Sequence, residues 1–288
     1  MINCTYHTRE VIALFQIYKE HKGFWKQIFL LAKNELIKTY KGAVIGPFWA
    51  VIKPAFTLFV YWFAFTVGIK DLGAVNVSVD GEFINTFDRF TFMLVGFIPW
   101  FFISDSITLG AKSIRLNRQF VTKVSFPVST IVTFTSMARL YVHFLLAAIM
   151  YLYVTLISGV GFSIYNLQFF LYCPLMFLFF VMLAWSTAPM SAFSADFENM
   201  IVSIMSGIFW VSGVIYSSYD FTSGFLKYLM LLNPINFFAN GYRNTFLYER
   251  WFFEYPLELI IFLVEFVVVF ALGVFNYNRL RKKLPDVL

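Results

Sequence analysis

The chain has 288 residues, of which 60% are hydrophobic and 22% aromatic, while only 13% are charged; its mean hydropathy is +0.73. A water-soluble domain of this length cannot bury so much apolar surface, so the composition excludes a soluble protein and requires a bilayer. The net charge of +6 is accompanied by no nucleic-acid-binding motif. We therefore assign the positive charge to membrane topology and expect no nucleic-acid partner.

Residues 1–42 are polar, and their second half has an imperfect amphipathic pattern over Phe24–Tyr40. At about 100° per residue, most of the apolar side chains fall on one side and most of the lysines on the other. This pattern predicts a helix in the cytoplasmic interface. The helix either anchors the chain to lipid or docks a protein as well, and its candidate contact residues are Trp25, Lys26, Lys33 and Lys38.

Six apolar stretches follow, and their lengths are close to or above the roughly 20 residues needed to cross about 30 Å of hydrocarbon. They are Ala43–Gly68, Phe92–Ala111, Thr130–Ser158, Leu167–Phe193, Met200–Tyr216 and Leu257–Tyr277. We predict an all-α integral membrane protein in which residues 43–277 form a six-helix transmembrane domain. Residues 278–288 form a cytoplasmic tail.

The segment between the second and third spans, residues 112–124, is amphipathic. Its apolar and basic side chains occupy opposite faces, and Phe126-Pro127 ends the helical pattern. Such a short helix fits a groove on a cytoplasmic partner, whereas the alternative is a basic loop that only enforces topology. The candidate contact residues are Lys112, Ile114, Arg115, Arg118, Phe120, Val121 and Lys123.

Residues 217–256 precede the last span and remain rich in Phe, Leu and Tyr. Two apolar runs, Phe221–Leu232 and Ile235–Leu247, flank Asn233-Pro234, and each run is too short to cross the bilayer. We predict a pair of re-entrant half-helices that line or cap an exit on the outer face.

The distribution of lysine and arginine predicts the orientation. Most of these residues lie in three segments: residues 1–42, residues 112–124 and the tail. The opposite, external side has only Lys70, Arg89, Lys227, Arg243 and Arg250. The three segments share one side of the membrane if all six stretches span. By the positive-inside rule this side is cytoplasmic, so both termini are predicted in the cytoplasm.

Three charged residues, Lys53, Asp105 and Arg139, fall inside the predicted spans and in their inner half. A charge at the centre of a membrane helix costs roughly 2.5–3.5 kcal/mol, so each should face the bundle, water or a partner. Lys53 and Arg139, with Lys41 at the membrane edge, are candidates to hold an anionic head group that arrives from the cytoplasm. The alternative is an ion pair between Asp105 and one of the two cations, and for Asp105 we favour pairing.

Several tryptophans and tyrosines carry information beyond their hydrophobicity, because their rings stack on sugars and donate a hydrogen bond. They are equally suited to the aromatic belts at the membrane interfaces. The candidates for a path or gate, which include the proline between the half-helices, are Trp100, Trp210, Tyr216, Pro234 and Tyr242.

No motif for catalysis is present. The dipeptide Gly-Lys never occurs, so the chain has no P-loop for nucleotide, and it contains no H-E-x-x-H or G-x-S-x-G sequence. We expect neither an enzyme nor a metal site in this chain, and no cofactor bound to it.

The order of these elements resembles the permease subunits of ABC-2-type polysaccharide exporters across nearly the whole chain. Within that family the likeness is greatest to the permeases that translocate wall teichoic acid. No single short motif is diagnostic; the resemblance rests on the order and spacing of Lys41–Trp49, Gly96–Trp100, Phe126-Pro127, Asn233-Pro234 and Tyr242–Tyr248.

This resemblance implies a homodimer that pairs with two copies of a separate ABC ATPase, which binds ATP and Mg. It implies that residues 112–124 are the coupling helix, that Phe24–Tyr40 contacts the ATPase, and that residues 217–256 form the outer gate. The cargo would be an undecaprenyl-pyrophosphate-linked anionic glycopolymer. Lys53-Pro54 departs from the sequence expected of such permeases, in which a small polar residue precedes this proline.

Other functions stay open at this point. The same architecture exports O-antigen, capsular polysaccharide or small drugs. An integral-membrane polyprenyl-phosphate glycosyltransferase would need a pair of acidic residues on one face. A secondary transporter would need Asp105, Arg139 and Glu265, a further charge inside the last predicted span, to relay ions.

Overall fold

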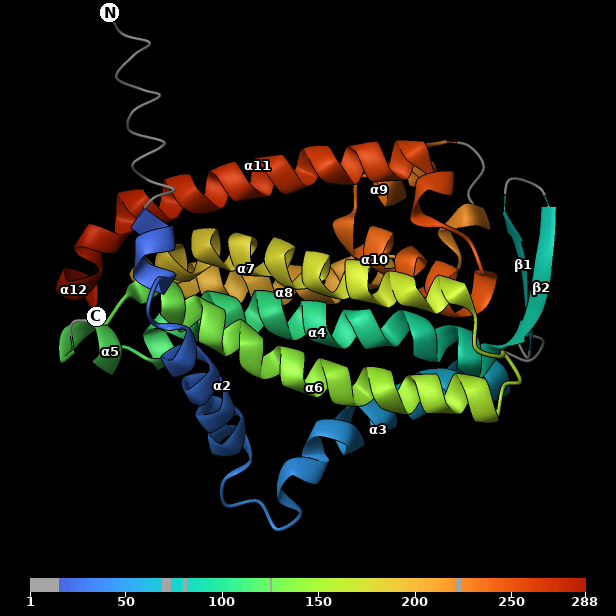
Figure 1. Cartoon of the computed structure of the whole chain (residues 1–288), viewed down its shortest axis with the longest axis horizontal. Coiled ribbons are helices and arrows are strands. Elements are labelled where there is room, and N and C mark those ends of the chain that lie inside the picture. The colour runs from blue at the N-terminus through green and yellow to red at the C-terminus, as the bar shows by residue number, and fades with distance from the viewer. Residues whose placement is uncertain (1–15, 69–73, 80–81, 125, 221–223) are drawn as a thin grey trace, which may run out of the picture.

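The computed structural model describes residues 16–68, 74–79, 82–124, 126–220 and 224–288. The start of the N-terminal segment and the first residues of the predicted half-helix at Phe221 lie outside these ranges. Most of the long helices run side by side along one axis, while α2 leaves the bundle at an angle (Figure 1). In chain order they are α2 (Trp25–Tyr40), α3 (Trp49–Phe63), α4 (Arg89–Leu116), α6 (Val128–Leu156), α7 (Phe169–Phe193), α8 (Ala195–Trp210) and α11 (Pro256–Leu280).

Within the described residues, five helical stretches are long and apolar enough to cross a membrane. They are Gly46–Gly68, Arg89–Leu116, Val128–Leu156, Ile164–Phe193 and Pro256–Val287. The first consists of a short 3-10 turn, α3 and a terminal π-helical turn, Ala64–Gly68.

The predicted span Met200–Tyr216 needs correction, because the helix there is α8 and ends at Trp210. Its 16 residues are about 24 Å long, less than the roughly 30 Å of a bilayer core. The chain turns after it, and Gly213 adopts a positive φ of 65° against Asn236. The predicted number of six spans is therefore not confirmed.

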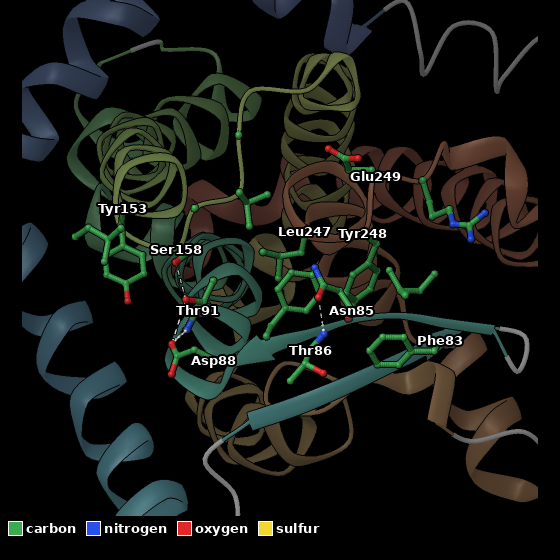
Figure 2. Close-up of a pocket in the computed structure, with 17 residues that line it drawn as sticks. Phe83, Asn85, Thr86, Asp88, Thr91, Tyr153, Ser158, Leu247, Tyr248 and Glu249 are labelled. Atoms are coloured by element: carbon green, nitrogen blue, oxygen red, sulfur yellow. Dashed lines mark hydrogen bonds between the residues drawn. The ribbon is translucent and has the colours of Figure 1, made fainter.

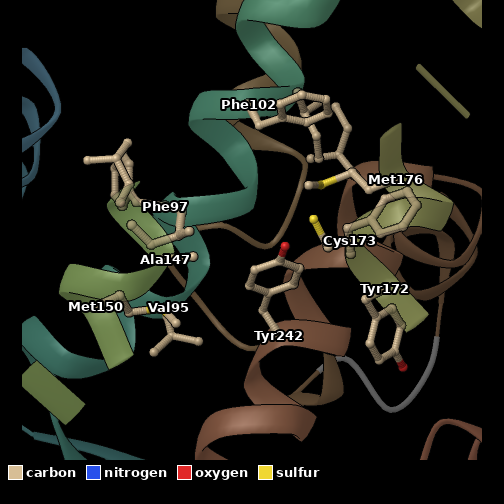
Figure 3. Close-up of a cluster of buried hydrophobic side chains, with 14 of the residues drawn as sticks. Val95, Phe97, Phe102, Ala147, Met150, Tyr172, Cys173, Met176 and Tyr242 are labelled. Carbon is tan, nitrogen blue, oxygen red and sulfur yellow. The ribbon is translucent and has the colours of Figure 1, made fainter. Parts of the chain in front are cut away.

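Helix α4 lies at the centre of the bundle, between α6 and α7 (Figure 1). In the most apolar part of α4, 56% of the residues are buried within the chain. The corresponding share is 11% in the first span and 22% in the last. Hydrophobic burial does not distinguish a neighbouring helix from lipid, so close packing has to hold the bundle together. Figure 3 shows this packing around Val95, Phe97, Phe102, Ala147, Met150, Tyr172, Cys173, Met176 and Tyr242.

A β-hairpin corrects the all-α prediction. Strands β1 (Ala74–Val79) and β2 (Glu82–Asp88) pair antiparallel in the connection after the first span, with an irregularity between Val77 and Ser78. Alternation places Val77 and Phe87 in the protein interior, while Asn76 and Thr86 stay exposed and hydrogen-bond to each other. The hairpin stands at the end of the bundle opposite the short helices α5 (Gln119–Thr122) and α12 (Leu284–Val287) (Figure 1).

Two short helices, α9 (Phe225–Leu231) and α10 (Pro234–Arg243), flank Asn233. The Asn233 side chain caps α10 by accepting from the Ile235 N–H at 3.0 Å, and Pro234 occupies the first helical position, where no N–H donor is needed. A π-helical turn, Asn244–Tyr248, extends α10, and a 3-10 turn, Phe252–Glu254, leads to α11. Every residue of α10 after Pro234 is buried within the chain.

The single helix expected over residues 112–124 is also corrected. Residues up to Leu116 continue α4, Asn117 ends that helix, and a separate short helix α5 covers Gln119–Thr122. Asn117 has non-helical backbone angles, and its side-chain amide hydrogen-bonds to the Ser113 carbonyl at 3.1 Å. The amphipathic pattern therefore reflects the buried end of α4 followed by a turn.

The three basic segments lie at one end of the bundle. Arg281, just after α11, pairs with Glu20, just before α2, at 2.7 Å, and α12 (Leu284–Val287) contacts both α5 and α7. The predicted tail is folded, since Leu284 is fully buried. Which side of a membrane this end faces stays a prediction.

Candidate functional site

A cavity of about 300 Å³ brings together the charged residues predicted inside the spans. It lies between the end of α2, the start of α3, and the facing sides of α4 and α6. Thr39, Tyr40, Trp49, Lys53, Pro54, Asp105, Arg139 and His143 are among the lining residues. Arg139 comes 11 residues after the start of α6, so the cavity is about 17 Å from the end that carries the basic segments.

Arg139 is the most enclosed charge of this cavity, with 8% of its surface exposed. Its Nη2 donates to the Thr39 hydroxyl at 3.2 Å, which ties α6 to the end of α2. The Nε atom is buried and has no partner among the described residues. Because Arg139 lines the cavity while its Nε is shielded, the terminal Nη groups are the donors that a ligand there can reach.

Lys53 and Asp105 line the same cavity from α3 and α4. Arg139 and Lys53 are the cations whose charges act on the Asp105 carboxylate. No ion pair between Asp105 and either cation, at 4.0 Å or closer, is present in the part of the chain that the structure describes. The cavity thus holds two positive charges and one negative charge without a closed ion pair. Lys41 is exposed beside the lining residue Tyr40 and does not line the cavity itself.

Tyr40 supplies a phenol to the same cavity from outside the spans. Burial raises the pKa of this tyrosine, and the nearby Arg139 charge partly opposes the rise. The hydroxyl therefore stays protonated near neutral pH and adds a hydrogen-bond donor to the two cations.

His143 connects the cavity to the buried helix α10. Its Nε2 forms a hydrogen bond of 2.7 Å with the Tyr242 hydroxyl. Tyr242, predicted from the sequence as a path residue, is only 1% exposed, and its ring lies next to Cys173 and Met176 (Figure 3). His143 could not be singled out from the sequence, because a single histidine in an apolar stretch forms no recognisable motif.

Arg243 was counted as an external cation and is instead fully buried, with 0% exposure. Its Nη1 donates to the carbonyls of Gly213 at 2.6 Å and Tyr216 at 3.2 Å, and its Nη2 donates to Val214 at 2.5 Å. The guanidinium lies 4.0 Å from the centroid of the Phe92 ring. It therefore joins α10 to the turn after α8 and to the first turns of α4.

The other predicted path residues lie beside this turn. Trp100 packs on Phe209 with ring centroids 5.1 Å apart, and Trp210 is more than half exposed. The Tyr216 hydroxyl donates to the Trp210 carbonyl at 2.8 Å. Pro234 begins α10. Trp210 is therefore the most exposed of these aromatic side chains in the single chain.

The residues predicted to face an ATPase fall into two groups. Lys112 and Arg115 pair with Glu198 of α8 at 3.2 and 3.3 Å, and Ile114 is fully buried. In α5 and its flanks, Arg118 and Lys123 are exposed, whereas Phe120 and Val121 are half-buried against the bundle. Of these predicted contact residues, the exposed cations are thus the two that flank α5.

Helix α2 presents a second exposed surface at the same end. Lys26, Lys33 and Lys38 are exposed and Trp25 is 51% exposed, while Ile28 and Ala32 face α6. Just before α2, burial lowers the pKa of His21, whose Nε2 bonds the Thr133 hydroxyl at 2.8 Å.

Glu20 fixes this helix start to the bundle. Its carboxylate accepts from the Ser129 hydroxyl at 2.6 Å, from Arg281 at 2.7 Å and from the Tyr277 hydroxyl. One side chain thus joins the start of α6 and the end of α11 to the segment that leads into α2. A hydrogen-bond hub between distant segments has no sequence periodicity, so the sequence did not reveal it.

Comparison with known proteins gives this arrangement a family. Residues 26–247 match the ABC-2 type transporter membrane family. The chain belongs to this family. Members of the ABC-2 family are transport subunits that act together with an ATPase subunit. This ABC-2 protein is also similar to the O-antigen export system permease protein RfbA of Myxococcus xanthus, with 24% identity over 274 residues that cover 93% of this chain and 97% of the relative.

Proposed function

We propose that the chain is the permease subunit of an ABC transporter that exports a lipid-linked glycopolymer across the cytoplasmic membrane of a bacterium. Membership of the ABC-2 family carries this proposal, and the similarity to an O-antigen export permease over almost its full length supports a polysaccharide cargo. Two copies of this chain would pair with two copies of the ATPase, which would bind ATP and Mg.

The inner cavity is the proposed site for the diphosphate head group of the carrier lipid. Arg139 offers a planar guanidinium at the cavity wall, which suits phosphate oxygens, and Lys53 adds a mobile point charge. Asp105 offsets one of these two charges, so the head group is attracted without being held irreversibly. Lys41, next to the cavity wall, would make the first contact as the head group approaches.

Movement of the ATPase would reach this site through two exposed surfaces. Arg118 and Lys123 around α5, and the lysine-bearing face of α2, lie at the end of the bundle where α4 and α11 also finish. Because Thr39 of α2 bonds Arg139, a shift of α2 changes one wall of the cavity. The permease would perform no chemistry and would supply contacts that differ between two conformations.

Two cargoes remain under this proposal. The resemblance seen in the sequence favours wall teichoic acid, whose chain is anionic, whereas the similar M. xanthus protein is named for O-antigen export. Transport of purified lipid-linked polymers of both kinds by the reconstituted complex decides between them.

The test of the head-group site uses Lys53→Gln, Arg139→Gln and the double variant in nanodiscs, with undecaprenyl diphosphate as the probe. Loss of one charge-assisted hydrogen bond is worth about 1.5–3 kcal/mol, so each single variant should weaken binding by roughly 10- to 100-fold. Lys282→Gln, which removes an exposed cation outside the cavity, is the matched control and should bind normally. Unchanged binding by the folded double variant would refute this site.

A further inference from the structure

A second and larger cavity, of about 880 Å³, lies at the opposite end of the chain. Its walls come from strand β2, the first turn of α4, the end of α6 with the residues after it, and the segment 247–250 that follows α10 (Figure 2). This volume is within the range of about 300–1,000 Å³ that small-molecule sites occupy. Residues 247–250 belong to the predicted outer gate, whereas none of the other lining residues was a candidate for the path or for the head-group site.

Two carboxylates, Asp88 and Glu249, line this outer cavity. Asp88 caps α4 with its Oδ2 atom, which accepts from the Thr91 N–H at 2.9 Å, and its Oδ1 atom has no partner in the described part of the chain. The Glu249 carboxylate is exposed and likewise makes no hydrogen bond or ion pair with the described residues. The neighbouring Arg250 is paired with Glu254 at 3.2 Å. The two open carboxylates therefore give the cavity a negative character.

Glu249 is held in an unusual backbone conformation. Its φ of 52° and ψ of 51° are left-handed, and no other non-glycine residue with positive φ is found among the described residues. Such a conformation costs about 1–3 kcal/mol and is concentrated at functional sites. The π-helical turn Asn244–Tyr248, which is buried, sets this geometry and brings the carboxylate to the cavity.

Aromatic rings complete the lining. Phe83 is 64% exposed on the hairpin, and Tyr153 lines the side formed by α6 (Figure 2). Flat rings stack on the C–H face of a sugar, while carboxylates accept hydrogen bonds from its hydroxyl groups. The described residues contain no group of three or more metal-ligating side chains, which makes a cation a poorer match than a sugar.

We propose that this outer cavity binds neutral sugar units of the exported polymer as it leaves the permease. The inference rests on the proposed export function and adds to it a contact site outside the membrane path. Phosphodiester groups are repelled by Asp88 and Glu249, whereas uncharged sugar rings are not. The site therefore selects for neutral stretches of glycan over a polyol-phosphate chain.

Binding is tested on the permease–ATPase complex in nanodiscs by saturation-transfer NMR and calorimetry. The probes are triacetylchitotriose, maltotriose and a glycerol-phosphate trimer. We expect at least one neutral probe to bind at millimolar concentration and the phosphate trimer to bind at least fivefold more weakly. Phe83→Ala and Glu249→Gln should each weaken the binding of the neutral probe at least fivefold. Glu249→Gln should also reduce the difference in affinity between the neutral probe and the phosphate trimer.

Phe225→Ala, a change at a highly exposed ring on α9, is the matched control and should leave binding unchanged. The proposal is overturned if no neutral probe binds, if the phosphate trimer binds as well as the sugars, or if the two cavity variants behave like the control. Coupled ATPase activity and head-group binding are measured in the same preparation. A failure of the outer site alone is thus distinguished from a failure of the export function.

The source of the sugar is tested with a photocrosslinker in place of Phe83 in the complex loaded with lipid-linked polymer. Crosslinks to the polymer that require ATP support a site for the departing chain. Crosslinks only to glycan added from outside, with or without ATP, contradict it.

Discussion

Replacement of Arg243 by alanine should destabilise the permease strongly. Three carbonyls of the turn after α8 lose their donor, and a buried unsatisfied acceptor costs about 1–3 kcal/mol. The cavity left by a large side chain adds to this loss. The variant also avoids the free-energy penalty of burying a charge, which is several kcal/mol, and this gain offsets part of the cost. We expect a net loss of about 3 kcal/mol.

For a chain of this size, a loss of about 3 kcal/mol corresponds to a fall in Tm of roughly 6–12 °C. The assay is thermal denaturation of the detergent-solubilised permease, followed by the fraction that remains monodisperse on size-exclusion chromatography. Arg243→Lys is the informative companion, because a single ammonium group cannot reach all three carbonyls and should give an intermediate Tm. A change below about 2 °C for the alanine variant would refute the reasoning, since the three hydrogen bonds would then contribute nothing net.

Three further predictions concern the packing, the Glu20 hub and the coupling surface. Gly241→Ala places a Cβ within 3.0 Å of the Tyr172 ring, so Tm should fall by several degrees, whereas Gly207→Ala on α8 meets nothing within 4 Å and should not lower it. Glu20→Gln removes the charge that three segments share, and we expect a loss of about 1–3 kcal/mol, measured as a lower Tm. Arg118→Glu, at an exposed position, should leave Tm unchanged but reduce stimulation of the ATPase by the permease; normal stimulation would count against α5 as the coupling element.

The positions of the helices could be predicted from the sequence where one local pattern determined them. The apolar stretches around α4, α6, α7 and α11 were predicted within a few residues, and α2 began one residue after its predicted start. Helix α8 was misjudged because apolar residues continue through 211–216, while the turn at Gly213 ends the helix. The hairpin was missed because its few alternating residues, such as Val75 and Val77, stand between long spans that dominate the hydropathy.

The candidate site was only partly predictable. Lys53, Asp105 and Arg139 were singled out because charges are expensive in a membrane, and the structure places all three around one cavity. The expected ion pair of Asp105 was not found in the described residues, because the distance between side chains depends on how three helices pack. Arg243 was assigned to the outside because its charge was counted without the carbonyls that enclose it.

The most direct test of the central claim is to co-express this permease with the ATPase encoded beside it, purify the assembly, and measure ATP-dependent transfer of a lipid-linked glycopolymer into proteoliposomes. We expect a stable complex of two permeases and two ATPases, and we expect transfer of the glycopolymer to stop when either subunit is omitted. A permease that purifies alone, binds no ATPase, and still moves or modifies a polyprenyl lipid would contradict it.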